Sequence, residues 1–240
     1  NIMKVSYKEI KSVSIMGPLR SRQISELICM NLSPFFSKLF IQLNLRPNTI
    51  TLFMIVFGLL GACCYAIPNL VFKICGILLL FFWFIMDCSD GEVARFTKQF
   101  SKYGKEMDYM AHLLDHPLVN LAMWATYIQI SKYNIYIIST LFIILISVEL
   151  LTRNLIVMIT YNKKEQPIQE KNSYHPSWAK WVFLQMVYFP NIILFLPIII
   201  LGDYIGLYNS FYFLIFVVTL NFINCINLYL KQLKLYYFSK

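Results

Sequence analysis

The chain has 240 residues, of which 58% are hydrophobic and only 14% are charged. Average soluble domains carry about 25% charged residues, so this composition excludes an ordinary soluble domain. The 21 Lys and Arg against 12 Asp and Glu give a formal net charge of +9. These basic residues border apolar stretches and are not interleaved with exposed aromatic residues, so we expect a membrane protein with no nucleic acid partner.

The first segment, residues 3–46, is too polar to span a membrane. Apolar residues recur at helical spacing between Ile24 and Phe40, among charged and amide side chains. This pattern predicts an amphipathic helix that lies in the membrane interface, and a plain connector is the alternative. We expect residues 47–240 to form a single membrane domain.

Six apolar stretches of the remaining chain are long enough to span a bilayer, which takes about 20 residues. They are Thr49–Ile67, Leu70–Asp90, Asp108–Ile130, Ile135–Tyr161, Trp178–Leu201 and Leu207–Leu230. Pro47 is placed to begin the first helix, and Pro190 and Pro197 predict a broken or kinked fifth span. The pattern predicts an all-α integral membrane fold with six transmembrane helices.

The distribution of Lys and Arg predicts the orientation of these helices. With a cytoplasmic N-terminus, 18 of the 21 basic residues would be cytoplasmic, and only Lys73 and Lys132 would lie outside. Because cytoplasmic loops carry an excess of basic residues, this orientation is favoured over its inverse. We therefore expect both termini in the cytoplasm and basic flanks that contact anionic membrane lipids.

One polar constellation lies where the second span ends and the third begins. It reads D-x2-D-G-x2-A-R-x8-G-x3-D and consists of Asp87, Asp90, Gly91, Ala94, Arg95, Gly104 and Asp108. A carboxylate at membrane depth costs about 2.5–3.5 kcal/mol, so a cluster of them indicates a functional site. Carboxylate oxygens are the ligands of hard divalent cations. The constellation therefore predicts a metal site, at the cytoplasmic end of the bundle.

The third span continues this polar face. Asp108, His112 and Asp115 stand at i, i+4 and i+7 and share one side of a helix. The stretch 96–103 is long enough to turn back and bring the two helices together. A non-enzymatic cation-binding or transport protein could use the same acids, but it would need polar residues that continue to the far side of the bundle.

The constellation resembles the signature of the CDP-alcohol phosphotransferase family, also called the CDP-alcohol phosphatidyltransferases. The run Arg46-Pro47-Asn48-Thr49-Ile50-Thr51 also resembles the start of that family's first span. The resemblance implies six membrane helices, often a homodimer, and one or two divalent ions, Mg²⁺ or Mn²⁺. It also implies transfer of a phospho-alcohol group, phosphatidyl or similar, from a CDP-linked donor to an acceptor alcohol, with release of CMP, as in phospholipid biosynthesis.

The resemblance also implies roles for the matching residues. The metal ligands would be Asp87, Asp90 and Asp108. The CDP moiety would be accommodated by Gly91, Ala94, Arg95 and Gly104.

The chain departs from the family's pattern at its last aspartate, which is His112 here. Imidazole is a poorer ligand than carboxylate for Mg²⁺ but is acceptable to Mn²⁺ or Zn²⁺. As a base, a histidine with an ordinary pKa of about 6.5 suits neutral pH. Alternatively, Asp115 supplies the missing carboxylate, or the chain is a catalytically silent relative. We expect His112 to lie at the metal site with Asp108 and to act as the base.

Three further polar residues are candidates for binding a phosphate or the acceptor. Glu149 and Arg153 stand at i, i+4 in the fourth span, and an ion pair between them would lower the cost of both. The functional alternative is that Arg153, with Asn154 beside it, faces a cavity and binds an anionic group. Lys98, in the loop after the second span, is the third candidate.

Overall fold

The computed structural model describes residues 5–14, 22–164 and 176–238. Within these ranges the chain forms helices joined by short connections, with no strand. The helices are α1 (Tyr7–Ser14), α2 (Ile24–Gln42), α3 (Pro47–Ala66), α4 (Leu70–Thr97), α5 (Gly104–Ile130), α6 (Ile135–Lys164), α7 (Trp178–Val187), α8 (Phe189–Tyr204) and α9 (Phe211–Phe238). The all-helical fold predicted from the sequence is confirmed.

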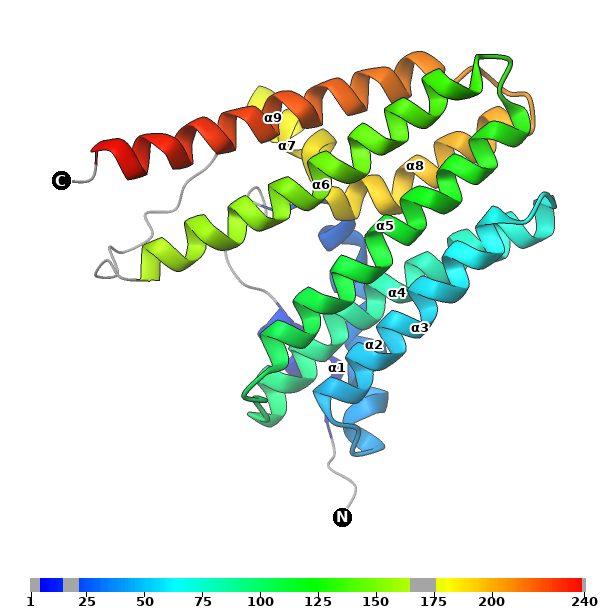
Figure 1. Ribbon diagram of the computed structural model, residues 1–240. Helices are drawn as coiled ribbons and strands as arrows, with labels where there is room; N and C mark the ends of the chain where they lie inside the picture. Colours follow the sequence, from blue (N-terminus) through cyan, green and yellow to red (C-terminus); the bar gives the residue numbers. More distant parts are fainter. Residues whose placement is uncertain (1–4, 15–21, 165–175, 239–240) are drawn as a thin grey trace.

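Most of these helices have the length and composition of membrane spans. Five of them, α2, α3, α4, α6 and α9, are apolar enough to cross a bilayer, and the bent pair α7–α8 makes a sixth if it counts as one span. The expectation that the segment before residue 47 is too polar to span is therefore wrong for α2, and α5, which contains the expected third span, is not among these helices. Helix α5 has 27 residues and lies beside α3 (Figure 1). Its lower hydropathy comes from polar side chains such as Asp115, His116 and Asn120, which are buried inside the bundle.

Small residues let α3 and α4 approach closely. A Cβ added at Gly76 would lie 2.7 Å from the backbone nitrogen of Tyr65 and 2.8 Å from the carbonyl oxygen of Gly61. Side chains other than hydrogen do not fit between these backbones, as is common where membrane helices pack. The α3–α4 hairpin is therefore closely packed, and α5 lies against its α3 helix.

The two helices that carry the constellation extend further than the apolar pattern predicted. Helix α4 continues to Thr97 instead of ending at Asp90, and α5 begins at Gly104 instead of Asp108. The apolar stretches mark the expected membrane spans, whereas the polar residues of the site continue the same helices beyond them. Lys98 follows the end of α4, and its φ of 57° is in the left-handed region that ends many helices.

Helix α2 turns a stripe of large apolar side chains outward and a row of small residues inward. Ile28, Leu32, Phe35 and Leu39 are exposed, whereas the small residues Ser25, Cys29, Ser33 and Ser37 are buried. The outward stripe suits contact with lipid chains.

A buried carboxylate fixes α1 and α2 to α4. The side chain of Glu92, on α4, accepts hydrogen bonds from Ser33 at 2.6 Å and Ser37 at 2.5 Å, both on α2. It also accepts one of 2.7 Å from Ser14 of α1. Because Glu92 follows directly after Gly91, the N-terminal helices are anchored next to the constellation.

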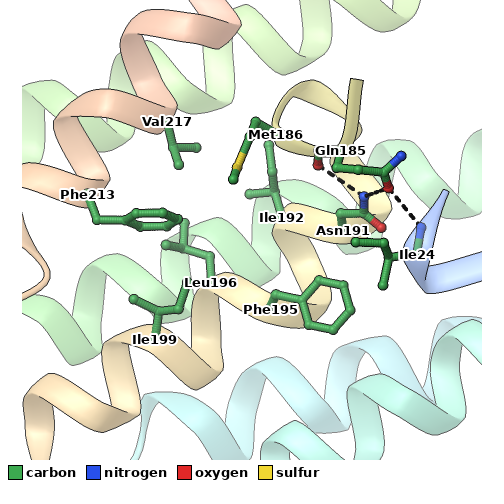
Figure 2. A pocket seen from close by; sticks show the side chains of 10 residues that line it. All are labelled: Ile24, Gln185, Met186, Asn191, Ile192, Phe195, Leu196, Ile199, Phe213 and Val217. Carbon is green, nitrogen blue, oxygen red and sulfur yellow. Dashed lines mark hydrogen bonds between the residues drawn. The ribbon is translucent and has the colours of Figure 1, made fainter. Parts of the chain in front are cut away.

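The predicted break in the fifth span is confirmed, with a bend of 73° between α7 and α8. The Nδ2 of Asn191 donates to the backbone oxygen and to the Oε1 of Gln185, both at 3.0 Å. Gln185 Oε1 also accepts from the backbone nitrogen of Ile24 at 2.8 Å (Figure 2). The bend is thus stabilised by side-chain amides that also satisfy the start of α2.

Candidate metal and substrate site

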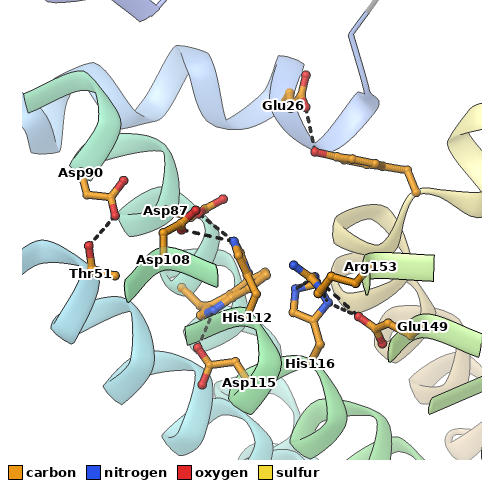
Figure 3. Close-up of polar contacts among 12 residues, drawn as sticks. Glu26, Thr51, Asp87, Asp90, Asp108, His112, Asp115, His116, Glu149 and Arg153 are labelled. Atoms are coloured by element: carbon orange, nitrogen blue, oxygen red, sulfur yellow. Dashed lines mark hydrogen bonds and ion pairs between the residues drawn. The ribbon is translucent and has the colours of Figure 1, made fainter. Parts of the chain in front are cut away.

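Two acids and a histidine from neighbouring helices converge at the start of α5. Asp87 extends from α4, and Asp108 and His112 extend from consecutive turns of α5 (Figure 3). The Nε2 of His112 lies 3.2 Å from Oδ1 of Asp87 and 3.5 Å from Oδ1 of Asp108. One ligand atom from each of the three lies within 4.8 Å of the other two.

The donor set of this cluster fits a divalent cation. Two carboxylates face one another here, and like charges at such a distance destabilise each other without a cation between them. The Oδ1 of Asp108 is buried and accepts no hydrogen bond from the described residues. A bound cation would satisfy this oxygen and offset both negative charges.

Asp90 lies beside this cluster and not within it. Its Oδ2 accepts a hydrogen bond of 2.6 Å from the hydroxyl of Thr51, which is buried on α3. The sequence carries no local signal for this contact, because it joins residues 39 positions apart. The structure therefore brings Asp87, Asp108 and His112 together, whereas Asp90 is bound to α3 through Thr51.

The glycines and alanine of the constellation line a pocket of about 510 Å³ between the ends of α3, α4 and α5. Its wall includes Gly91, Ala94, Arg95, Gly104 and Asp108, and Asp90 lines it as well. The pocket adjoins the Asp87–Asp108–His112 cluster through Asp108. It therefore has the position that a nucleotide pyrophosphate would need.

Arg95 is oriented by the N-terminal helix. Its Nε donates to the backbone oxygen of Val13 at 3.0 Å. A Cβ added at Gly91 would lie 2.9 Å from the Arg95 guanidinium, so the missing side chain of this glycine makes room for the arginine. The guanidinium is thus held at the wall of the pocket.

A second pocket of about 480 Å³ reaches the cluster from the other side. Asp87, His112 and Arg153 line its polar part, and residues of α6, α7 and α9 such as Ile156, Leu184 and Leu228 line its apolar part. Sequence reasoning missed two aromatic residues in this wall, Tyr109 and Tyr188. Their spacing resembles that of ordinary membrane aromatics, so no pattern marked them.

Arg153 belongs to a buried polar network behind the second pocket. The Oε1 of Glu149 lies 3.7 Å from Nη2 of Arg153. It lies closer still to Nδ1 of His116. The other oxygen of Glu149 accepts a 2.7 Å hydrogen bond from Asn120. The network orients the guanidinium while Arg153 still reaches the pocket. The expected ion pair is present, and Arg153 also lines the predicted cavity.

The two remaining candidates lie at the edges of this region. Asn154 is exposed, and its Oδ1 accepts a hydrogen bond of 3.1 Å from the hydroxyl of Tyr109. Lys98 is exposed at the end of α4 and lines a surface pocket with Arg46 and Asn48. Lys98 therefore lies near the first pocket, and Asn154 lies near the second pocket.

Asp115 and His112 have different surroundings although both lie on α5. Asp115 is fully buried and lines neither pocket. Trp83 Nε1 donates to its Oδ2 at 2.9 Å, and a Cβ added at Gly58 would lie 2.6 Å from its carboxyl carbon. His112 instead lines the second pocket.

Comparison with known families agrees with this geometry. The sequence model of one family, described as CDP-alcohol phosphatidyltransferase, matches residues 44–223, which is more than half of the chain. The match includes the whole constellation and both pockets' polar residues on α4, α5 and α6. A search of curated proteins finds no match. The chain belongs to the CDP-alcohol phosphatidyltransferase family.

Proposed function

We propose that this protein transfers a phospho-alcohol group from a CDP-linked donor to the hydroxyl of an acceptor alcohol and releases CMP. The observation that carries the proposal is the position of the Asp87–Asp108–His112 cluster between two pockets. One pocket is lined by the glycines and arginine of the constellation, and the other is lined by Arg153 and apolar side chains. A transfer reaction needs two substrates that meet at one charged centre, and this arrangement provides it.

The first pocket would hold the CDP moiety. Gly91, Ala94 and Gly104 leave space beside the backbone, and the Arg95 guanidinium can bind a phosphate oxygen. Asp87, Asp90 and Asp108 would hold one or two divalent ions, which neutralise the charge of the pyrophosphate. The Thr51 hydroxyl keeps Asp90 turned toward this pocket.

The second pocket would hold the other substrate. Arg153 would bind an anionic group of that substrate, and the apolar walls from α6, α7 and α9 would contact lipid chains. Asn154 can orient the Tyr109 hydroxyl at the same wall, and Lys98 would attract phosphate near the first pocket. These contacts support a substrate with a charged head and an apolar body on this side.

His112 occupies the place at which an attacking hydroxyl would arrive from the second pocket. The hydroxyl must lose a proton as it attacks. Because Asp115 lines neither pocket, His112 is the better placed of the two predicted groups. Its Nε2 can serve as a proton acceptor or as a metal ligand, but it cannot do both at once.

The orientation of the domain in the membrane, and its contact with the N-terminal segment, are inferred from charge and packing. We propose that the site and both termini are cytoplasmic, because basic residues concentrate at that end of the spans. Residues 3–46 would form a juxtamembrane segment whose helices α1 and α2 are anchored through Glu92. Residues 47–240 would form the membrane domain, and the protein would act as a homodimer in contact with membrane lipids.

The experiment is to supply the detergent-purified full chain with a panel of labelled CDP-alcohols, CDP-diacylglycerol among them, together with Mg²⁺ or Mn²⁺. We expect CMP release from at least one donor, dependent on an acceptor alcohol and abolished by a chelator. Failure of every donor with both metals, in protein that is folded, would overturn the proposal in favour of a silent relative.

A further inference from the structure

We propose that Asp87, Asp108 and His112 form a mixed nitrogen–oxygen site that selects a transition-metal ion such as Mn²⁺ over Mg²⁺, with His112 as a direct ligand. The inference rests on the proposed function for the need of a divalent ion, but its test does not depend on turnover. It concerns the one position at which this chain departs from the four-acid pattern that it resembles.

The spacing of the three side chains fits a shared ion. Metal bonds to imidazole nitrogen and carboxylate oxygen measure about 2.0–2.2 Å, so adjacent ligands of one ion lie about 3–3.5 Å apart. The Nε2 of His112 lies 3.2 Å from an oxygen of Asp87 and 3.5 Å from an oxygen of Asp108. These separations are those expected between neighbouring ligands of a single ion.

The imidazole is held in this orientation by its neighbours. The ring of His112 packs edge to face against Trp83, with centroids 5.6 Å apart, and against His116, at 5.1 Å. Its Nδ1 is buried without a hydrogen bond among the described residues. Packing, and not a hydrogen bond at Nδ1, therefore aims Nε2 at the two carboxylates.

The neighbouring carboxylates are engaged by other partners. Asp90 accepts a hydrogen bond from Thr51 and lines the first pocket, where it would face a second ion and not replace His112. Asp115 is bound by Trp83 and packed against Gly58. Glu149 is held by His116 and Asn120. The cluster therefore offers one nitrogen and two carboxylates.

One nitrogen and two carboxylates determine which divalent ion the site prefers. Mg²⁺ prefers oxygen ligands in a regular octahedron and takes few protein ligands. Imidazole suits transition metals, and affinity for such sites rises along the series that begins with Mn²⁺. A site that has lost one carboxylate and gained one imidazole therefore loses affinity for Mg²⁺ more than for Mn²⁺.

One consequence concerns the proton of the acceptor hydroxyl. A metal-bound Nε2 has no free lone pair, so His112 would be a ligand and not the base that its sequence position first suggests. The proton would then pass to a carboxylate oxygen of the same cluster.

The test measures metal binding to the detergent-purified full chain with no substrate present. Electron paramagnetic resonance of added Mn²⁺ gives the affinity of the site for this ion, and competition with Mg²⁺ gives the ratio of the two affinities. Pulsed electron paramagnetic resonance detects any nitrogen bound to manganese. We expect nitrogen coupling in the wild type that changes when histidine is labelled with ¹⁵N. We expect His112→Asp to lose the coupling and to lower the Mn²⁺-to-Mg²⁺ affinity ratio at least tenfold. Asp203→Asn, an acid substitution far from the cluster, is the control and should change neither.

Absence of nitrogen coupling in wild-type protein that binds Mn²⁺ would overturn the inference, as would a ratio that His112→Asp leaves unchanged. If His112→Asp does not fold, the labelled wild type alone still decides whether a histidine is a ligand. Nitrogen coupling without CMP release would contradict the proposed function only. CMP release with Mn²⁺ bound and no nitrogen coupling would contradict this inference only.

Discussion

The indole Nε1 of Trp83 donates a 2.9 Å hydrogen bond to Oδ2 of Asp115, joining α4 to α5 inside the bundle. Both side chains are fully buried. The contact uses a carboxylate that lies on the same helical stripe as Asp108 and His112. Asp115 therefore supports the packing of the two helices that position the site.

Asp115→Asn should retain most of the activity. The amide oxygen of asparagine can still accept from Trp83, so we expect CMP release within about threefold of wild type, or ~0.7 kcal/mol. Trp83→Phe removes the donor and leaves a buried acceptor unpaired, which costs about 1–3 kcal/mol. It should therefore lower thermal stability in detergent. Loss of activity in Asp115→Asn together with activity in His112→Ala would identify Asp115 as the essential group.

Two glycine substitutions should separate stability from substrate binding. At Gly76 an alanine Cβ would lie 2.7 Å from a backbone nitrogen of α3, and overpacking of this kind costs about 1–3 kcal/mol. At Gly104 the nearest atom, on Ser101, is 3.4 Å away, so the side chain fits but enters the first pocket.

We therefore expect Gly76→Ala to unfold at a lower temperature, and Gly104→Val to unfold normally while its KM for the CDP donor rises. Thermal unfolding and donor titrations would check both. An unchanged KM in Gly104→Val would mean that the donor does not occupy this pocket.

Arg153→Ala should weaken binding of the substrate in the second pocket. A charge-assisted hydrogen bond to an anionic group contributes about 1.5–3 kcal/mol, so kcat/KM should fall about tenfold or more. Arg153→Lys should recover only part of the loss because lysine lacks the planar fork. Lys132→Ala, in a loop remote from the site, is the matched control. If Arg153→Ala and the control have equal activity, Arg153 does not bind substrate and only pairs with Glu149.

Glu92→Ala should release the N-terminal helices from the membrane domain. The substitution removes the shared acceptor of Ser14, Ser33 and Ser37, and each hydrogen bond to a charged group contributes about 1.5–3 kcal/mol. Limited proteolysis should then cleave before α3 at least tenfold faster than in wild type. Glu106→Ala, an acid substitution in the first turn of α5, is the control. Equal cleavage rates of the two variants would contradict the anchoring role of Glu92.

The sequence allowed the helical fold and the hairpin of the site to be predicted because both depend on local spacing. Asp87 and His112 fall on facing stripes of consecutive helices, and a short connection leaves few other arrangements. The Glu92 cluster and the Asp90–Thr51 bond could not be predicted, since they depend on how distant helices pack. The same reason explains why Glu149, expected to pair with Arg153 one turn away, has His116 of α5 as its closest partner.

Asp87→Asn tests the central claim most directly, because Asp87 contributes to the candidate metal cluster and lines the second pocket. The measurement is metal-dependent CMP release by the purified variant, beside wild type and the remote control Asp203→Asn. Loss of one carboxylate ligand should reduce release at least a hundredfold, ~2.7 kcal/mol of transition-state stabilisation, while thermal unfolding stays normal and the control stays active. Near-normal CMP release by folded Asp87→Asn would contradict the account.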